Sequence, residues 1–393
     1  VKESPYWVLE AKPHTDSYAQ TVETVSWLLR DAVQRQLVSD VPVCSFLSGG
    51  IDSSVVTAIA SRQLGQEGVT LNTFSFDFAH NDACFQSNAF QPTRDRPYVD
   101  QVLALYPLHH TYLECDEATL AGLLGDAVRM KDLPGMTDVD ASLLYFCGLV
   151  KQHNKVALTG ECADEIFGGY PWFYREDLLR VDGFPWSPDL SARTALLSDE
   201  AIHELHLEEY TRERYRDTLA QVPLLPEEKA ETRRRREMSY LNLRWFMQTL
   251  LDRMDRTSMA WGLEARVPFA DHRIVEYVYN VPWSMKYENG MEKKLLRDAC
   301  KDLLPPQLLY RKKSPYPKTY SPVYEALLAE RFEQLLANPQ APVHRFMDRK
   351  KAAQFLAQPK DYGKPWFGQL MAGPQMIAYF LQVNDWMERY GIS

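Results

Sequence analysis

Long apolar runs, basic tracts studded with aromatic residues and paired cysteines are all missing from this chain of 393 residues. No stretch approaches the roughly 20 apolar residues that a membrane-spanning helix needs, and no signal-peptide core is present. The net charge of −9 comes without any basic run studded with aromatic residues, which argues against nucleic acid as the main partner. We therefore expect a cytoplasmic protein with neither a membrane nor a nucleic-acid partner.

The cysteines lack the Cys-x-x-Cys spacing of zinc sites and redox pairs. They lie mostly in apolar segments, which predicts reduced and buried thiols. These cysteines are Cys44, Cys84, Cys115, Cys147, Cys162 and Cys300. The cationic cluster from Arg233 to Arg236 sits between Glu231 and Glu237, which predicts a solvated helix face.

What the chain does contain is an alternation of strand-like and helix-like segments, which predicts an α/β fold with a doubly wound parallel sheet. The expected strands lie at residues 41–47, 69–78, 110–115 and 155–159. After Tyr174 the strands stop and the pattern is mainly helical. We therefore divide the chain into a leading helix and linker (1–36), an α/β domain (37–190) and a mainly helical C-terminal part (191–393).

The string Ser-Gly-Gly-Ile-Asp-Ser-Ser at positions 48–54 lies between an expected strand and an expected helix. Its glycines let the backbone approach a phosphate chain, and its hydroxyls and helix N-terminal amides can donate to phosphate oxygens. No lysine follows the glycines as it does in the P-loop, which favours chemistry at the α-phosphate of a nucleotide. Asp52 adds a ligand for a metal ion.

A second loop follows the expected strand at 155–159 and carries Glu161, Asp164 and Glu165 at the start of a helix. Acidic residues at that place also complement the helix dipole. Because ligands bind at the carboxyl ends of parallel strands, we expect Asp52 and Asp164 to hold a magnesium ion from the two loops. Lys293, after a distant Asn-Gly turn, is a candidate to neutralise charge developing at phosphorus.

The polar segment from Asp77 to Asp95 is too long for a routine connection between elements. It is either a loop that covers the substrate or a plain surface insertion.

Four ordered strings resemble the synthetase domain of the glutamine-dependent asparagine synthetases. They are the loop at 48–54, Thr159-Gly-Glu-Cys-Ala-Asp-Glu-Ile-Phe-Gly-Gly-Tyr170, Met259-Ala-Trp-Gly-Leu-Glu-Ala-Arg-Val-Pro-Phe-Ala-Asp271 and Gly290-Met-Glu-Lys293. The resemblance, which runs from about Ser39 to Arg311, implies a fold of the pyrophosphate-loop type. It also implies an enzyme that uses ATP and Mg²⁺ to adenylate a carboxylate, releases pyrophosphate and lets ammonia displace AMP.

The resemblance further implies roles for individual residues. Glu161 would take a proton from the attacking nitrogen, and Lys293 would stabilise the transition state at the α-phosphate. Asp52 and Asp164 would hold the magnesium. The residues that would bind ATP and its pyrophosphate are Phe46, Leu47, Ser48, Gly49, Gly50, Asp52, Ser53, Ser54, Phe76 and Gly160.

One departure from the family pattern concerns the source of nitrogen. The family's full enzymes carry an N-terminal glutaminase domain whose first residue is a catalytic cysteine, whereas Val1 to Gln36 resembles the linker that would follow such a domain. Free ammonia is therefore the expected nitrogen donor for this chain. A glutaminase domain or subunit and a homo-oligomer stay open as partners.

The other departure lies in the string from Thr137 to Ser142, where typical members have an arginine for the substrate carboxylate and this chain has Asp140. We therefore predict that Thr137 and Asp140 contact the acid, and that Asp140 attracts a cationic group of it. The acid is then aspartate in a changed orientation, or another acid such as meso-diaminopimelate. Other members of the family close β-lactam rings. Asp138 is expected to cap the helix that follows.

Two further functions compete with an amide ligase. A tRNA-modifying enzyme with the same pyrophosphate loop predicts a basic surface or paired cysteines, and the sequence has neither. A degenerate scaffold that only binds ligands predicts loss of the magnesium carboxylates or of Lys293, yet all are retained.

Overall fold

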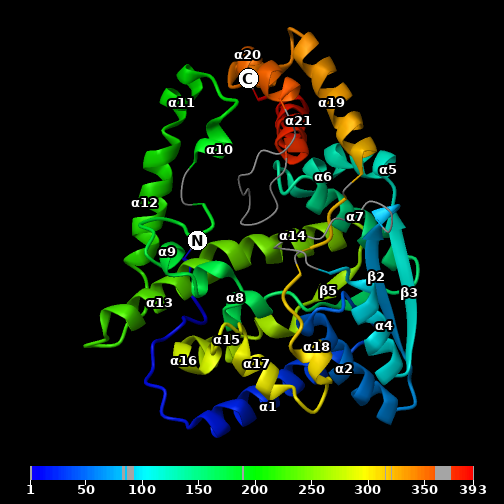
Figure 1. Ribbon diagram of the computed structural model, residues 1–393, viewed down its shortest axis with the longest axis vertical. Coiled ribbons are helices and arrows are strands. Elements are labelled where there is room, and N and C mark those ends of the chain that lie inside the picture. The colour runs from blue at the N-terminus through cyan, green and yellow to red at the C-terminus, as the bar shows by residue number, and fades with distance from the viewer. Residues whose placement is uncertain are drawn as a thin grey trace.

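The computed structural model describes residues 2–81, 85, 93–187, 190–314, 316–319, 321–358 and 373–392. Its centre is a five-stranded parallel sheet with the strand order β3-β2-β1-β4-β5 (Figure 1). The strands are β1 (Val43–Phe46), β2 (Leu71–Phe78), β3 (Leu108–Cys115), β4 (Val156–Leu158) and β5 (Glu264–Arg266). The predicted α/β class and the doubly wound parallel sheet are thus confirmed. Of the polar segment at 77–95, residues 82–84 and 86–92 lie outside the described residues.

Helices account for most of the remaining elements. Up to residue 180 they are α1 (Tyr18–Leu37), α2 (Ile51–Gln66), α4 (Arg96–Leu105), α5 (Glu117–Gly122), α6 (Leu124–Lys131), α7 (Asp138–Lys151), α8 (Ala163–Phe167), η1 (Pro171–Phe173) and α9 (Glu176–Leu179). Beyond it they are α10 (Ser191–Thr194), α11 (Asp199–Leu205), α12 (Leu207–Leu219), α13 (Ala230–Leu241), η2 (Asn242–Met247), α14 (Gln248–Met259), η3 (Pro268–Ala270), α15 (His272–Asn280), α16 (Trp283–Lys286), α17 (Lys294–Ala299), α18 (Pro306–Leu309), α19 (Pro322–Ala337), η4 (Pro342–Arg345), α20 (Arg349–Ala357) and α21 (Gly373–Tyr390).

Helices cover both faces of the sheet, as a parallel sheet requires. One face packs on α1, α2 and α4, with Ile59 and Leu71 in the shared core. The other face packs on α7 and α14, where Phe74 of β2 meets Phe146 and Met254. Further helices form two groups beside this centre, with α11 and α12 in one and α19 and α21 in the other (Figure 1). The described cysteines are free and buried, as predicted: Cys44, Cys115, Cys147, Cys162 and Cys300.

The strand order reverses between β1 and β4. From β1 the chain proceeds outward to β2 and β3, and it then returns to add β4 and β5 on the other side. The carboxyl ends of two adjacent strands therefore lead into loops that run in opposite directions, which is where open α/β sheets bind ligands. In this chain those two loops are the segments that follow residues 46 and 158.

The prediction that strands stop after Tyr174 is wrong at one place. β5 lies inside the string Met259 to Asp271 and pairs in parallel with β4, with Ala265 opposite Ala157. The amide of Thr159 continues this pairing by donating to the Arg266 carbonyl at 2.9 Å. β5 has only three residues and half-exposed side chains, so it carries no apolar alternation that a sequence pattern would reveal.

The arginine cluster of α13 is not a solvated helix face. The side chain of Arg233 is 58% exposed, as that prediction requires. Arg236, however, is only 8% exposed. Arg234 donates to the carbonyls of Leu179 and Val181, at 2.8 and 2.6 Å. Arg234 and Arg235 are covered because η1 and α9 and the segment after them pack on this helix, whereas Arg233 stays exposed. The local sequence of α13 gives no sign of that contact.

Candidate active site

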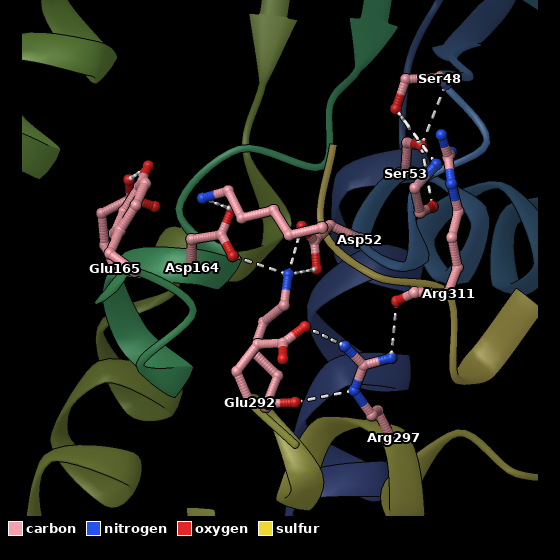
Figure 2. A network of polar contacts seen from close by, with 12 residues as sticks. Ser48, Asp52, Ser53, Asp164, Glu165, Glu292, Arg297 and Arg311 are labelled. Atoms are coloured by element: carbon pink, nitrogen blue, oxygen red, sulfur yellow. Dashed lines mark hydrogen bonds and ion pairs between the residues drawn. The ribbon is translucent and has the colours of Figure 1, made fainter. Parts of the chain in front are cut away.

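The loop after β1 depends on one glycine. Gly49 has φ +71°, and a Cβ there would lie 2.9 Å from the Val99 nitrogen and 3.0 Å from the Asp95 oxygen. Only glycine fits this backbone. Beside it the hydroxyls of Ser48 and Ser53 lie 3.0 Å apart, and the Ser48 amide donates to Ser53 Oγ at 3.1 Å (Figure 2). The loop thus gathers hydroxyls at the N-terminus of α2, where a phosphate is stabilised.

The loop after β4 presses directly on the start of α2. A Cβ on Gly160 would lie 2.5 Å from the Ser53 amide nitrogen and 2.8 Å from the Asp52 carbonyl carbon. The register of β1 and β4, with Ser45 opposite Leu158, ends the two strands side by side. The predicted convergence of the two loops is therefore what the structure contains.

Two carboxylates and two lysines meet between these loops. Lys293 Nζ donates to both oxygens of Asp52, at 2.8 and 2.9 Å, and lies 2.7 Å from Asp164 Oδ1. Lys313 Nζ lies 2.8 Å from Asp164 Oδ2. Figure 2 shows the carboxylates of Asp52 and Asp164 pointing toward one another across this contact. Lys293 sits in the left-handed region, with φ +54°, directly before α17.

Burial and charge decide how these groups ionise. Burial opposes the charge on Asp164, but the attraction of Lys293 and Lys313 holds its pKa well below the ordinary value. Burial likewise opposes the charge on Lys293, and its two carboxylate partners raise its pKa above the ordinary value. Asp52 has one lysine in contact instead of two, so burial prevails and raises its pKa. Asp164 is thus the more strongly held anion of the pair.

Glu161 lies at the carboxyl end of β4 and is paired with an arginine. Arg253 Nη2 donates to Glu161 Oε1 at 2.6 Å, while the other carboxylate oxygen, Oε2, is buried and has no hydrogen-bond partner in the part of the chain that the structure describes. Burial raises the pKa of Glu161, and the attraction of Arg253 opposes this rise. A carboxylate with one free oxygen and a raised pKa is suited to accept a proton.

A cavity of about 300 Å³ joins these groups at the carboxyl ends of β1 and β4. The predicted site residues that line it are Phe46, Leu47, Ser48, Gly50, Asp52, Ser53, Phe76, Gly160, Glu161, Asp164 and Lys293. Gly49 shapes the loop from behind, and the Ser54 hydroxyl is buried with no hydrogen-bond partner. The two catalytic candidates and most of the expected nucleotide ligands therefore share one space.

Five cations of this cavity escaped the sequence motifs: Arg253, Arg297, Arg311, Lys312 and Lys313. Arg253 lies on the buried stripe of α14 with Leu250, Met254 and Thr257, so an arginine at an apolar position of that helix was the available signal. Arg311 and Lys313 follow α18. Arg311 is 6% exposed and pairs with Asp95, while Lys313 Nζ lies 3.4 Å from the centre of the Tyr170 ring.

The structure does not bring Thr137 and Asp140 to the lining of this cavity. Asp140 is fully buried, and its Oδ2 accepts a hydrogen bond from the Met136 amide at 2.7 Å. That bond closes the turn before α7, which explains why an aspartate stands here. The negative charge of Asp140 still acts on a residue of the cavity. Burial lowers the pKa of Arg253, and the attraction of Glu161 and Asp140 raises it above the ordinary value.

The helix cap expected at Asp138 is displaced by one residue. α7 begins at Asp138, and Thr137 occupies the capping position with φ +51° and no side-chain cap. The Asp138 carboxylate instead accepts from Thr137 Oγ1 at 2.8 Å and from Gln375 Nε2 at 3.1 Å. The carboxylate of Asp138 thus bonds to a side chain of α21, and α7 has no side-chain cap.

A family model described as asparagine synthase matches residues 24–388. This chain belongs to the asparagine synthase family. It is 49% identical to asparagine synthetase [glutamine-hydrolyzing] 3 of Bacillus subtilis (strain 168) over 390 residues, which cover 99% of this chain and 63% of the relative.

Two relatives of lower sequence identity also match this chain. Asparagine synthetase [glutamine-hydrolyzing] 1 of Bacillus subtilis (strain 168) is 28% identical over 346 residues, covering 79% of this chain and 52% of the relative. The amidase chyE of Penicillium rubens is 27% identical over 375 residues, covering 80% of this chain and 55% of the relative. The chain therefore spans between half and two thirds of the length of these curated relatives. In the described part of the chain, no helix is both long and apolar enough to cross a membrane.

The carboxylates fit a magnesium ion that is shared with phosphates. Asp52 and Asp164 both contact Lys293 Nζ, and Mg²⁺ in nucleotide sites takes one or two carboxylates together with phosphate oxygens. Within the described residues no three His, Cys, Asp or Glu side chains cluster as a complete metal cage. The two carboxylates match the number that Mg²⁺ takes when phosphate oxygens complete its coordination.

Proposed function

We propose that this chain is an ATP-dependent amide ligase that forms AMP, with aspartate as its acid substrate and ammonia as its nitrogen donor. The observation that carries this proposal is the meeting of Asp52, Asp164 and Lys293 between the two glycine loops. Family membership and the 49% identical relative support the same reaction class.

The first step is attack of a substrate carboxylate oxygen on the α-phosphorus of ATP. The bond between the α-phosphorus and the bridging oxygen breaks, and pyrophosphate leaves. Ser48 and Ser53 donate to the leaving pyrophosphate, and Lys293 stabilises the charge that builds up on the phosphoryl oxygens. Asp52 and Asp164 would hold magnesium, which would neutralise part of the phosphate charge.

Arg253 is the residue that we assign to the second carboxylate of aspartate. It is 6% exposed and lines the cavity, and its Nε has no hydrogen-bond partner among the described residues. An arginine whose N–H groups lack an acceptor can bind a carboxylate of the substrate. This favours an acid with two carboxylates, one that is adenylated and one that Arg253 binds. This assignment replaces the predicted contact with Asp140.

The second step is attack of ammonia on the acyl carbon of the adenylate. A carbon–nitrogen bond forms, the carbon–oxygen bond to AMP breaks, and the nitrogen loses a proton. We assign that proton to Glu161 Oε2, the carboxylate oxygen without a partner. Because Arg253 holds the other oxygen, the base keeps a fixed orientation.

Product analysis across a panel of acids tests this proposal. The chain is supplied with ATP, Mg²⁺, ammonia and each acid in turn, including aspartate, glutamate and meso-diaminopimelate, and the nucleotide and amide products are separated. We expect AMP, pyrophosphate and an amide with aspartate. ADP and inorganic phosphate as primary products would refute the ligase, and an amide formed only with another acid would refute the substrate.

A further inference from the structure

A second cavity, of about 490 Å³, lies apart from the active site. Its walls come from α13, α15, α16 and the N-terminal segment, and it shares no lining residue with the cavity around Lys293. The charged side chains of its lining are Glu228, Glu231, Arg235, Arg236 and Lys286. No step of the proposed reaction uses this space.

The charges around the second cavity do not balance. Arg236 pairs with Glu228, and Arg235 pairs with Glu231 at 3.2 Å. Lys286 is 6% exposed and its Nζ donates to the Val278 carbonyl at 2.8 Å. No carboxylate of the described residues forms an ion pair with Lys286, although two arginines lie close by. A buried ammonium group without an anion is costly, so this arrangement favours a ligand that supplies the anion.

The walls also indicate which kind of anion fits. The Trp283 ring already has three neighbours, because Arg235 lies 4.9 Å from its centre, Tyr287 stacks on it at 5.5 Å and Phe173 stacks on it at 6.1 Å. Stacking on a ligand ring is therefore not what this cavity provides. The lining also carries the hydroxyls of Thr232, Ser239 and Ser284, whereas the amide of Asn280 is already bonded to the carbonyls of Glu10 and Glu276.

We propose that the second cavity binds a small organic anion that carries a carboxylate or phosphate group, with Lys286 as the counter-charge. The hydroxyls of the lining would donate to the remaining anion oxygens. The site is separate from the active site, so the proposal does not depend on the reaction assigned above.

The ionisation of Lys286 gives the proposal a distinctive signature. Burial lowers the pKa of Lys286 to about 7, and Arg236 and Arg235 lower it in the same direction. An anion in the cavity favours the charged form, so binding above neutral pH should take up a proton. The titratable groups that face the cavity or adjoin Lys286 are His14, Glu165, Glu228, Glu231, Arg235, Arg236 and Tyr279. His14 has a pKa lowered by burial and is therefore neutral in this range.

Calorimetric titration with inorganic phosphate and with succinate tests the proposal and distinguishes the two anion types. We expect at least one probe to bind, with an affinity that falls roughly tenfold for each pH unit above about 7. Two buffers of different ionisation enthalpy should reveal the proton that is taken up. An affinity that does not change with pH, or no binding of either probe by the unaltered chain, would overturn the proposal.

Variants then locate the bound anion. Lys286→Met removes a charge that has no carboxylate partner, so we expect it to fold, to bind the probe at least about tenfold more weakly and to take up no proton. Lys350→Met, on the exposed side of α20, is the matched control and should bind as before. Normal binding in Lys286→Met would place the anion elsewhere and refute the inference.

Discussion

Arg253 Nη2 and Glu161 Oε1 lie 2.6 Å apart. The buried guanidinium group of Arg253 therefore contacts the carboxylate that we assign as the proton acceptor. This pairing links acid binding to proton transfer. It also means that a change at Arg253 should alter two measurable properties together.

The first prediction concerns Arg253→Met. Loss of a charged hydrogen-bond donor should raise the KM for the acid by roughly ten- to a hundredfold while the KM for ATP changes little. The pKa of Glu161 should rise further, because Arg253 opposes the effect of burial. Arg256→Met, three residues along α14 with a side chain that is 45% exposed, is the matched control. Equal effects of the two substitutions on the acid KM would contradict the role of Arg253.

The second prediction concerns the pH dependence of amide formation. Glu161 must be ionised to accept a proton, and burial raises its pKa above the ordinary value. The rate should therefore fall as the pH decreases through this raised pKa and stay level above it, until other groups titrate. In Arg253→Met the acidic limb should move to higher pH. A limb that moves to lower pH would show that Glu161 is not the titrating base.

The third prediction separates the two half-reactions. Glu161→Gln should still exchange pyrophosphate into ATP in the presence of the acid, because adenylation does not need this base. Amide formation should drop by a factor on the order of 10² or more. Quantifying the two reactions on one preparation checks this, and a parallel loss of both would mean that Glu161 acts in adenylation.

The fourth prediction concerns Lys293→Ala. We expect kcat for adenylation to fall by a factor on the order of 10² or more, since the lysine acts mainly in the transition state. Nucleotide binding, measured by calorimetry, should be largely retained. Lys301→Ala, whose side chain is 58% exposed just after α17, serves as the control. A large loss of nucleotide affinity without a change in kcat would assign Lys293 to ground-state binding instead.

The fifth prediction concerns Asp52→Asn and Asp164→Asn. Each removes a proposed magnesium ligand and one anionic partner of Lys293, so each should abolish adenylation. The effect of Asp164→Asn on thermal stability should be the larger, because Asp164 contacts two lysines and Asp52 contacts one. Asp199→Asn, whose side chain is 93% exposed, is the control for a change of charge alone.

Short sequence motifs predicted the two glycine loops of this site. The contacts of Arg253 and Lys286, which join helices far apart in the sequence, were not predicted. Ser48, Gly160 and Glu161 stand in unbroken motifs beside strands, so short-range pattern was enough to place them. Arg253 becomes a site residue only because α14 packs across the sheet, and Lys286 becomes isolated only because α13 lies beside α16. Such contacts depend on the tertiary arrangement, which neither spacing nor composition records.

β5 has a consequence for how the chain folds. This strand comes from the C-terminal half and covers the edge of β4, and Arg266 at its end donates to the carbonyls of Gln36 and Val38. A fragment that ended near residue 190 would leave β4 as an unpaired edge, which invites aggregation. The segments on either side of that boundary therefore complete a single sheet. We expect them to unfold together in one cooperative transition, so that neither persists as an independent folding unit.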